Sequence, residues 1–154
     1  MRIRLMKKSD ISQVVELFVD SYKKEEKSMR WSNAMAEKYI LMIYRMCKDL
    51  CFVIVNKDKI IACAMSIITP EYDKCIIDSK ILLVHPDFRK QGLAKKLIRK
   101  TCLKAESKYN IGIIESNIYT LTNFPISWYE SIGFRTKKNF ELTRANISKV
   151  LKEI

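Results

Sequence analysis

The sequence is poor in glycine, proline and histidine. Only three of its 154 residues are glycine and three are proline, which excludes collagen-like and Pro/Gly-rich disordered chains. One histidine, His85, and the absence of a Cys-x-x-Cys pair give no ligand set for a metal site. No apolar run approaches the roughly 20 residues of a membrane span, and the N-terminus lacks the apolar segment of a signal peptide. We therefore expect a metal-free, cytoplasmic protein with no membrane association.

Basic residues outnumber acidic ones. There are 29 Lys and Arg against 17 Asp and Glu, a formal net charge of +12. Such a charge favours polyanionic ligands, including nucleic acid, anionic membranes or a phosphate-rich cofactor, although a lysine-rich composition also occurs without a dedicated macromolecular partner. The lysines fall largely on expected helices and are not interleaved with aromatic residues on a strand, which disfavours nucleic acid as a partner.

Five cysteines are present, an odd number, and each lies in an apolar segment. We interpret them as reduced thiols of the core in a reducing compartment.

The periodicity of apolar residues indicates a single mixed α/β domain over residues 1–154. Strands are expected at residues 2–7, 51–55, 60–68, 75–84 and 113–118, followed by a terminal hairpin of a strand from Phe134 and residues 139–144. Helices are expected from Asp10 behind an N-cap at Ser9, after Ser32 or Asn33, from Gly92, and from Pro125 to Ser131. The resulting sheet is mostly antiparallel, with helices on both faces.

The expected second helix carries an apolar stripe of its own. Methionine and aromatic side chains recur at helical spacing in the expected second helix. Stripes of this kind usually belong to the core, so we expect these residues to be buried. They are Met35, Tyr39, Met42, Ile43 and Met46.

The stretch from Ile81 to Lys96 combines an apolar strand, a basic loop and a helix start. Gly92 stands where the loop becomes the helix. The first N–H groups of a helix have no intrahelical acceptor, and the helix dipole places partial positive charge there. This stretch is therefore predicted to bind an anion such as phosphate.

Two motifs resemble a known family. The segment from Val84 to Ala94, with Arg89 and Gly92 at fixed positions, resembles the coenzyme A signature of the GNAT N-acetyltransferase superfamily. The segment from Ile126 to Phe134 resembles the same family's later motif, a helix with an apolar-Tyr-Glu-x-x-Gly-Phe pattern. Both occur in the expected order and in the expected elements.

The resemblance implies the GNAT fold, a mixed, mostly antiparallel twisted sheet of about six to seven strands with helices on both faces. It also implies transfer of an acetyl group from acetyl-CoA to a primary amine by direct attack in a ternary complex. An alternative is a catalytically silent CoA-binding module with a regulatory role. The oligomeric state stays open, a homodimer included.

The resemblance implies a set of coenzyme A contacts. In the family the pantetheine arm pairs with the end of the fourth strand, and the backbone N–H near Leu83 or Val84 polarises the thioester carbonyl. Either Thr122 or Asn123 meets the cofactor. The cofactor-binding residues expected on this basis are Leu82, Leu83, Val84, Arg89, Lys90, Gln91, Gly92, Leu93, Ala94, Lys95, Asn123 and Tyr129.

Three residues are candidates for the chemistry. Tyr129 matches the family tyrosine that protonates the leaving thiolate, or else is an ordinary core tyrosine. Asp78 and Glu115 are candidate bases on adjacent inner strands, or else surface-paired carboxylates. Counting along a regular strand places Asp78 on the same face as Lys80, Leu82 and Val84.

The acceptor is not identified by these motifs. In the family it is shaped by the first two helices, their loop and the last hairpin. The loop here contains Glu25 and Glu26, which suit a cationic amine, and Trp31, which can stack on it or cover it; ordinary loop residues are the alternative. The net charge of +12 disfavours long-range capture of polycations.

Overall fold

The fold was analysed in a computed structural model of the chain. It describes residues 1–23, 30–118, 125–137, 147–148 and 151. The chain divides into two compact units, Met1–Asn117 and Ile118–Ile154, which are described separately.

The first unit contains a five-stranded sheet in the order β1-β2-β3-β4-β5. The strands are β1 (Arg2–Leu5), β2 (Cys51–Asn56), β3 (Lys59–Glu71), β4 (Lys74–Val84) and β5 (Ile114–Ser116). The helices are α1 (Ile11–Lys23), α2 (Asn33–Met46) and α3 (Leu93–Tyr109), with 3-10 turns η1 (Lys8–Asp10), η3 (Lys48–Leu50) and η4 (Pro86–Phe88). Neighbouring strands are antiparallel except β4 and β5, which are parallel because α3 crosses over between them.

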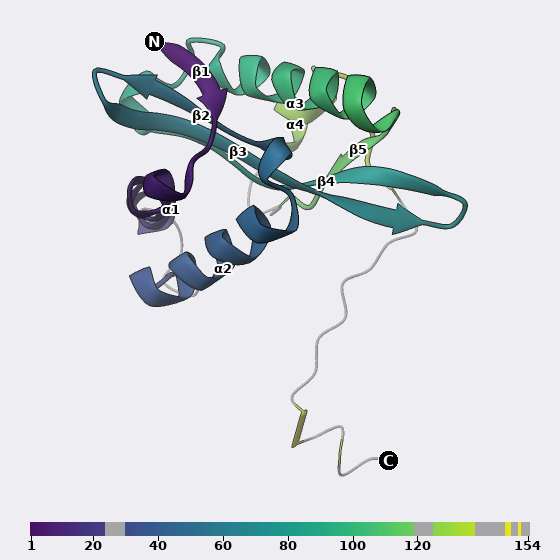
Figure 1. The fold of residues 1–154 in the computed structure, drawn as a ribbon, viewed down its shortest axis with the longest axis horizontal. Helices are drawn as coiled ribbons and strands as arrows, with labels where there is room; N and C mark the ends of the chain where they lie inside the picture. The colour runs from purple at the N-terminus through teal and green to yellow at the C-terminus, as the bar shows by residue number, and fades with distance from the viewer. Residues whose placement is uncertain (24–29, 119–124, 138–146, 149–150, 152–154) are drawn as a thin grey trace. The chain divides into compact units, whose positions relative to one another are not determined.

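The predicted fold class is confirmed: the sheet is mixed and mostly antiparallel, with α1 and α2 on one face and α3 on the other (Figure 1). Five strands are described instead of six to seven. The second strand of the predicted terminal hairpin, residues 139–144, lies outside the described residues, and residues 134–137 are described without strand structure.

Each face of the sheet has its own apolar core. On one face, α1 and α2 pack on β3 through side chains such as Val14, Phe18 and Ile40. On the other face, Leu93 and Leu97 of α3 pack on β2 and β3. The two cores explain why β2 and β3 are apolar on both sides and read as continuous apolar runs.

The predicted core stripe of α2 is only partly buried: Ile43 is in the core and Tyr39 packs against it, but the prediction is wrong for the three methionines. Met35, Met42 and Met46 are 54%, 48% and 58% exposed, whereas Ala36 and Ile40 are fully buried. Successive helix residues are rotated by about 100°, so the two sets lie on different sides of the helix, and the set with Ala36 and Ile40 faces the sheet. Of the two predicted N-caps, Ser32 is the one used: its Oγ accepts a hydrogen bond from Met35 N at 3.2 Å.

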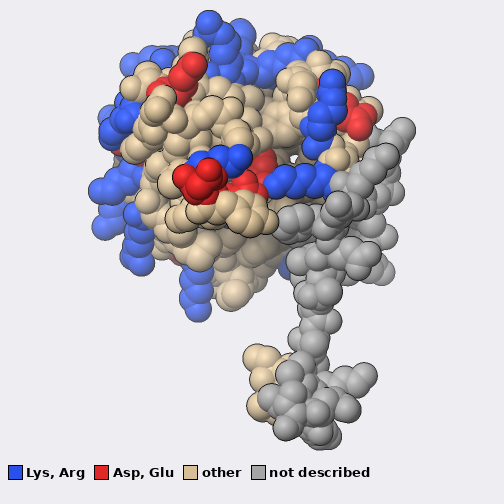
Figure 2. Space-filling model, turned by 90° about the vertical axis from the view of Figure 1, so that its right-hand side faces the viewer, with Lys and Arg blue, Asp and Glu red and all other residues tan. Residues whose placement is uncertain are grey.

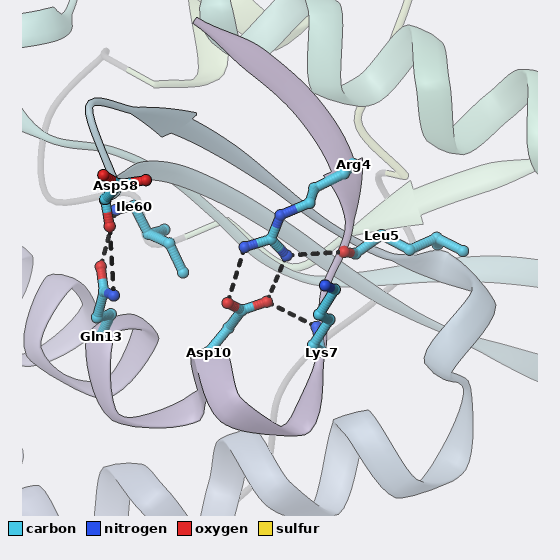
Figure 3. Close-up of polar contacts among 7 residues, drawn as sticks. All are labelled: Arg4, Leu5, Lys7, Asp10, Gln13, Asp58 and Ile60. Carbon is cyan, nitrogen blue, oxygen red and sulfur yellow. Dashed lines mark hydrogen bonds and ion pairs between the residues drawn. The ribbon is translucent and has the colours of Figure 1, made fainter.

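The entry to α1 is held by an ion pair that the sequence did not reveal (Figure 3). Asp10 Oδ2 and Oδ1 accept hydrogen bonds from Arg4 Nη1 at 2.6 Å and Nη2 at 2.9 Å. Asp10 Oδ2 also accepts from Lys7 N at 2.6 Å. The polar contacts at this helix start are thus made by Asp10 and not by the predicted cap Ser9, and they join β1 to η1, which leads into α1.

A second polar link ties α1 to the β2–β3 hairpin (Figure 3). Gln13 Oε1 accepts a hydrogen bond from Ile60 N at 2.9 Å, and Gln13 Nε2 donates to Asp58 O at 3.5 Å. The amide side chain thus satisfies backbone groups beside the hairpin turn.

Pro70 lies inside β3, which continues to Glu71, beyond the strand expected at residues 60–68. It is paired with Cys75, and the turn is Tyr72–Asp73. The register of β2 with β3 ends at Met65, so the β3 edge beyond it has no strand partner among the described residues. Proline is tolerated on such an edge because its missing N–H breaks no ladder bond.

The cysteines only partly follow the prediction of core thiols. All five are free; Cys47, Cys51 and Cys63 are buried, whereas Cys102 is half-buried and Cys75 is exposed.

The second unit is described mainly through α4 (Ile126–Glu130) and the turn that ends it. Gly133, at φ 101°, donates its N–H to Glu130 O, and Phe134 N donates to Tyr129 O, both at 3.1 Å. This pair of bonds is a Schellman motif, and its usual hydrophobic contact is made by the Tyr129 and Phe134 rings, whose centroids are 5.0 Å apart. The prediction that Gly133 closes this helix is confirmed.

Candidate functional site

A β-bulge interrupts β4 at Lys80. Ile81 is paired with Met65 of β3, and Ser79 is paired with Ser66, the next residue of β3. Lys80 is therefore an extra residue on β4, opposite no residue of its own. No feature of the local sequence marks this position, because bulges arise from strand pairing.

β4 and β5 separate at the same point. Their parallel register covers only Ile77–Ile114, Asp78–Glu115 and Ser79–Ser116. From Lys80 onward, the β5 side of β4 has no strand partner in the part of the chain that the structure describes. The bulge increases the local twist of β4, which accounts for the divergence from β5.

Because of the bulge, the side chains of β4 lie on other faces of the sheet than a regular strand would give. Asp78 lies opposite Ile67, and Ile81 and Leu83 lie opposite Met65 and Cys63. These residues belong to the face covered by α1 and α2. Leu82 and Val84 instead pack with the α3 face. Asp78 therefore does not share a face with Leu82 and Val84, as the count along a regular strand predicted.

The open edge of β4 presents backbone groups of alternate residues. His85 N donates to Ile61 O of β3 at 2.8 Å, so His85 faces β3. The N–H and C=O groups of successive strand residues point to opposite sides. Those of Leu83 therefore also point to β3, whereas those of Leu82 and Val84 point to the open edge. Of the three residues predicted to pair with pantetheine, Leu83 thus has its backbone groups directed away from that edge.

The start of α3 has backbone amides with no side-chain cap. Gly92 is its N-cap at φ 73°, with no side-chain cap, and the first turn has no acidic residue. Lys96 N donates to Gly92 O at 3.1 Å, so the three preceding amides have no intrahelical acceptor. They belong to Leu93, Ala94 and Lys95.

The loop before α3 is locally ordered by its own polar contacts. Arg89 Nε donates to Val84 O at 3.2 Å, and His85 Nδ1 accepts from Asp87 N at 3.3 Å. The first bond holds the loop against the end of β4 and leaves Arg89 four further N–H donors. Lys90 and Gly92 are both left-handed, at φ 61° and 73°, and left-handed residues are typical of backbone turns that bind anions.

The sheet brings together two of the three candidate catalytic residues. Asp78 and Glu115 are register partners on β4 and β5. The Asp78 side chain is 9% exposed; its Oδ2 is ion-paired with Lys80 Nζ. Its Oδ1 is buried and has no hydrogen-bond partner among the described residues. Glu115 makes contacts of its own.

Tyr129 belongs to the second unit. It is 8% exposed, and its ring meets Trp128 and Phe134 edge-on, with centroids 4.9 and 5.0 Å away. Thr122 and Asn123 lie outside the described residues, as do Glu25 and Glu26 of the acceptor loop.

Trp31 is part of an aromatic cluster between α1 and α2. It stacks on Tyr39 with centroids 5.4 Å apart and meets Phe18 edge-on at 5.1 Å. The described neighbours of Trp31 are thus aromatic rings of the protein itself, which favours a packing role for it.

Buried thiols do not supply a nucleophile. Burial raises the pKa of Cys51 and of Cys63 to about 12. These thiols stay protonated at neutral pH, and the thiolate is the reactive form.

Metal and membrane sites were also sought in the described part of the chain. It contains no group of three or more His, Cys, Asp or Glu side chains arranged to hold a metal ion. It also contains no helix long and apolar enough to cross a membrane.

The surface charge is spread out. Figure 2 shows Lys and Arg side chains around the rim and also near the middle of the visible face, with acidic side chains among them at both places. On this face the basic residues do not form one continuous stripe of the kind that follows a nucleic-acid backbone.

The family model for the acetyltransferase (GNAT) domain matches residues 48–136. The chain therefore belongs to the GNAT acetyltransferase family. A comparison with curated proteins found no match.

Solved structures share the fold. A possible acetyltransferase from Clostridium difficile 630 superposes with a TM-score of 0.77 at 13% identity, covering 95% of this chain and 97% of that one. An aminoglycoside N-acetyltransferase in complex with CoA gives a TM-score of 0.75 at 16% identity, covering 94% and 93%. The apo aminoglycoside 6'-N-acetyltransferase of Acinetobacter haemolyticus gives 0.72 at 17% identity, covering 96% and 99%.

Proposed function

We propose that this chain transfers the acetyl group of acetyl-CoA to a primary amine. The observation that carries the proposal is the conjunction, within one unit, of an open anion site at the start of α3 with an unpaired edge on the preceding strand, β4. Coenzyme A has pyrophosphate at one end and an amide-containing arm at the other. A helix start suits the first, and a free strand edge suits the second.

The residues of the open edge have defined parts in this proposal. Leu82 and Val84 supply the backbone groups that pair with the pantetheine arm. Val84 C=O is already engaged by Arg89, which leaves Val84 N–H to polarise the thioester carbonyl. Gly92 and the following amides hold the pyrophosphate, with Arg89, Lys90 and Lys95 adding positive charge.

The transfer needs one proton acceptor and one donor. The amine nitrogen attacks the thioester carbonyl carbon, the C–S bond breaks, and coenzyme A leaves as a thiolate. Asp78, with its open Oδ1, accepts the proton that the amine loses. Tyr129 donates a proton to the thiolate and is reprotonated from solvent.

The first test is binding and turnover with acetyl-CoA. Acetyl-CoA should raise the melting temperature of the protein, because a ligand that binds only the folded state stabilises it. A panel of amino acids, polyamines, aminoglycosides and lysine peptides, scored by release of coenzyme A, then identifies the acceptor class. No thermal shift, where a known CoA enzyme responds, would sink the proposal. A shift without turnover on any amine would instead favour a silent CoA-binding module.

Tyr129→Phe should lower kcat about 100-fold while changing the KM for acetyl-CoA less than about twofold, because the proton donor to the thiolate is lost while the ring is kept. The ring contacts with Trp128 and Phe134 do not involve the hydroxyl. Steady-state kinetics check the split between kcat and KM. Tyr72→Phe, at a position that is 99% exposed, is the matched control. Unchanged kcat in Tyr129→Phe would assign Tyr129 to the core alone.

A further inference from the structure

Asp78 and Lys80 form a polar pair at the point where β4 and β5 separate. Asp78 belongs to the last-but-one register pair with β5, and Lys80 is the bulge residue. Strand residues rise about 3.3 Å each, so Lys80 lies about 7 Å along β4 from Leu82, the first residue whose backbone faces the open edge beyond the bulge. The pair therefore adjoins the edge where the thioester is proposed to bind.

The pair is only half complete. A buried carboxylate is stable when it is paired and when both oxygens are hydrogen-bonded. Asp78 Oδ2 is paired with Lys80, but Asp78 Oδ1 is buried and has no donor among the described residues. A buried oxygen without a hydrogen-bond donor of this kind points to a missing donor. The amine substrate that receives the acetyl group carries such N–H donors.

Solvent reaches the pair on the Lys80 side. The Lys80 side chain is 25% exposed, against 9% for Asp78. An incoming amine thus meets the Lys80 ammonium before it reaches Asp78. Lys80 also offsets the charge of Asp78, so the pair as a whole is close to neutral. It can accept one hydrogen-bonding amine, but it offers no second negative charge to a polycation.

We propose that Lys80 is a specificity-determining residue, which makes the enzyme prefer acceptors with a single amine over acceptors with two or more positive charges. The inference rests on the proposed N-acetyltransferase function and deepens it. A second ammonium on the acceptor is repelled by Lys80, and like charges brought together in a partly buried site strongly disfavour the wrong partner. Aminoglycosides and polyamines are therefore expected to be poor acceptors for this chain.

The test compares two acceptors that have the same five-carbon chain and differ by one amine and its charge, n-pentylamine and 1,5-diaminopentane. The measured quantity is the ratio of kcat/KM for the monoamine to that for the diamine. Wild type should favour the monoamine about tenfold, and Lys80→Gln should reduce the ratio at least about fivefold. Glutamine keeps an N–H donor for Asp78 Oδ2 while removing the charge, so the fold is preserved.

Two controls separate local from general charge effects. Lys80→Arg keeps the charge and should keep the ratio within about twofold. Lys59→Gln, at an exposed residue of the β2–β3 hairpin, removes the same overall charge at a distance and should also keep the ratio. An unchanged ratio in Lys80→Gln, or an equal fall in Lys59→Gln, would overturn the assignment.

A binding measurement covers the case in which neither amine turns over. With CoA present, 1,5-diaminopentane should raise the melting temperature of Lys80→Gln but not that of wild type; equal shifts, or none in either protein, overturn the proposal. Acetyl-CoA is added alone in parallel. If acetyl-CoA gives no thermal shift in wild type, the proposed acetyltransferase function itself is contradicted. If the shift is present but the kcat/KM ratio of monoamine to diamine is unchanged in Lys80→Gln, only the role of Lys80 is rejected.

Discussion

Replacing Asp10 with asparagine is expected to lower the free energy of unfolding by about 2–3 kcal/mol, or about 5–10 °C in melting temperature. The carboxylate is 6% exposed and accepts three hydrogen bonds, two from Arg4 and one from Lys7 N. Asparagine removes the charge and one acceptor, which leaves the Arg4 guanidinium without its counter-ion. Urea unfolding at neutral pH measures the loss.

The control for this variant is Asp58→Asn. Asp58 is exposed, and the contact drawn for it in Figure 3 uses its backbone oxygen. Its left-handed φ of 66° suits asparagine as well as aspartate, so the change should cost less than about 0.5 kcal/mol. A similar loss in both variants would contradict the role given to the Arg4–Asp10 pair.

The stabilisation by Asp10 should depend on pH with a definite sign. The Arg4 hydrogen bonds, followed by the Lys7 N–H, hold the pKa of Asp10 below its usual range despite the opposing effect of burial. In the unfolded chain the pKa of Asp10 is the ordinary aspartate value of about 3.9, so the unfolded chain binds the proton more readily than the folded chain. The difference between wild type and Asp10→Asn should be constant above about pH 5 and shrink as pH falls below about 4. Urea titrations at several pH values check this, and a difference that grows at low pH would contradict it.

Replacing Gly92 with valine should weaken acetyl-CoA binding at least about tenfold and destabilise the fold by about 1–2 kcal/mol. Gly92 has φ 73°, a conformation that β-branched residues avoid. A Cβ at this position would meet no heavy atom within 4 Å. The cost therefore comes from the backbone and from the added side chain beside the anion site, and not from a clash within the protein.

Two further variants separate these causes. Gly92→Asn tolerates the left-handed conformation, so it should retain most of the stability while its side chain still hinders the close approach of a phosphate. Gly112→Ala, at a glycine with equally open surroundings and no left-handed φ, should change neither stability nor affinity appreciably. Calorimetric titration with acetyl-CoA measures the affinities. Wild-type affinity in Gly92→Val would place the anion elsewhere.

The helix start at Gly92 illustrates what sequence can predict. A strand end, a basic loop, Gly92 and a lysine-rich helix are consecutive, and a helix start exposes its amides wherever it is placed. The Schellman turn at Gly133 was predictable for the same reason, because its hydrogen bonds join residues within one short segment.

The methionine stripe of α2 shows where the pattern is ambiguous. Met35, Met42 and Met46 recur at helical spacing, but so do Ala36, Ile40 and Ile43, on another side of the same helix. Periodicity identifies an amphipathic helix without stating which of two apolar stripes faces the sheet. The packing of α2 on α1 and β3 decides that Ala36, Ile40 and Ile43 are the side chains buried in the core.

The sequence by itself determined the fold class and the order of the elements as far as β5, because these follow from local periodicity. Only the tertiary structure decided the bulge at Lys80, the separation of β4 from β5, and the face of the sheet to which Asp78 belongs. These features depend on the register between strands distant in sequence, and one extra residue in a strand exchanges the faces of all residues beyond it.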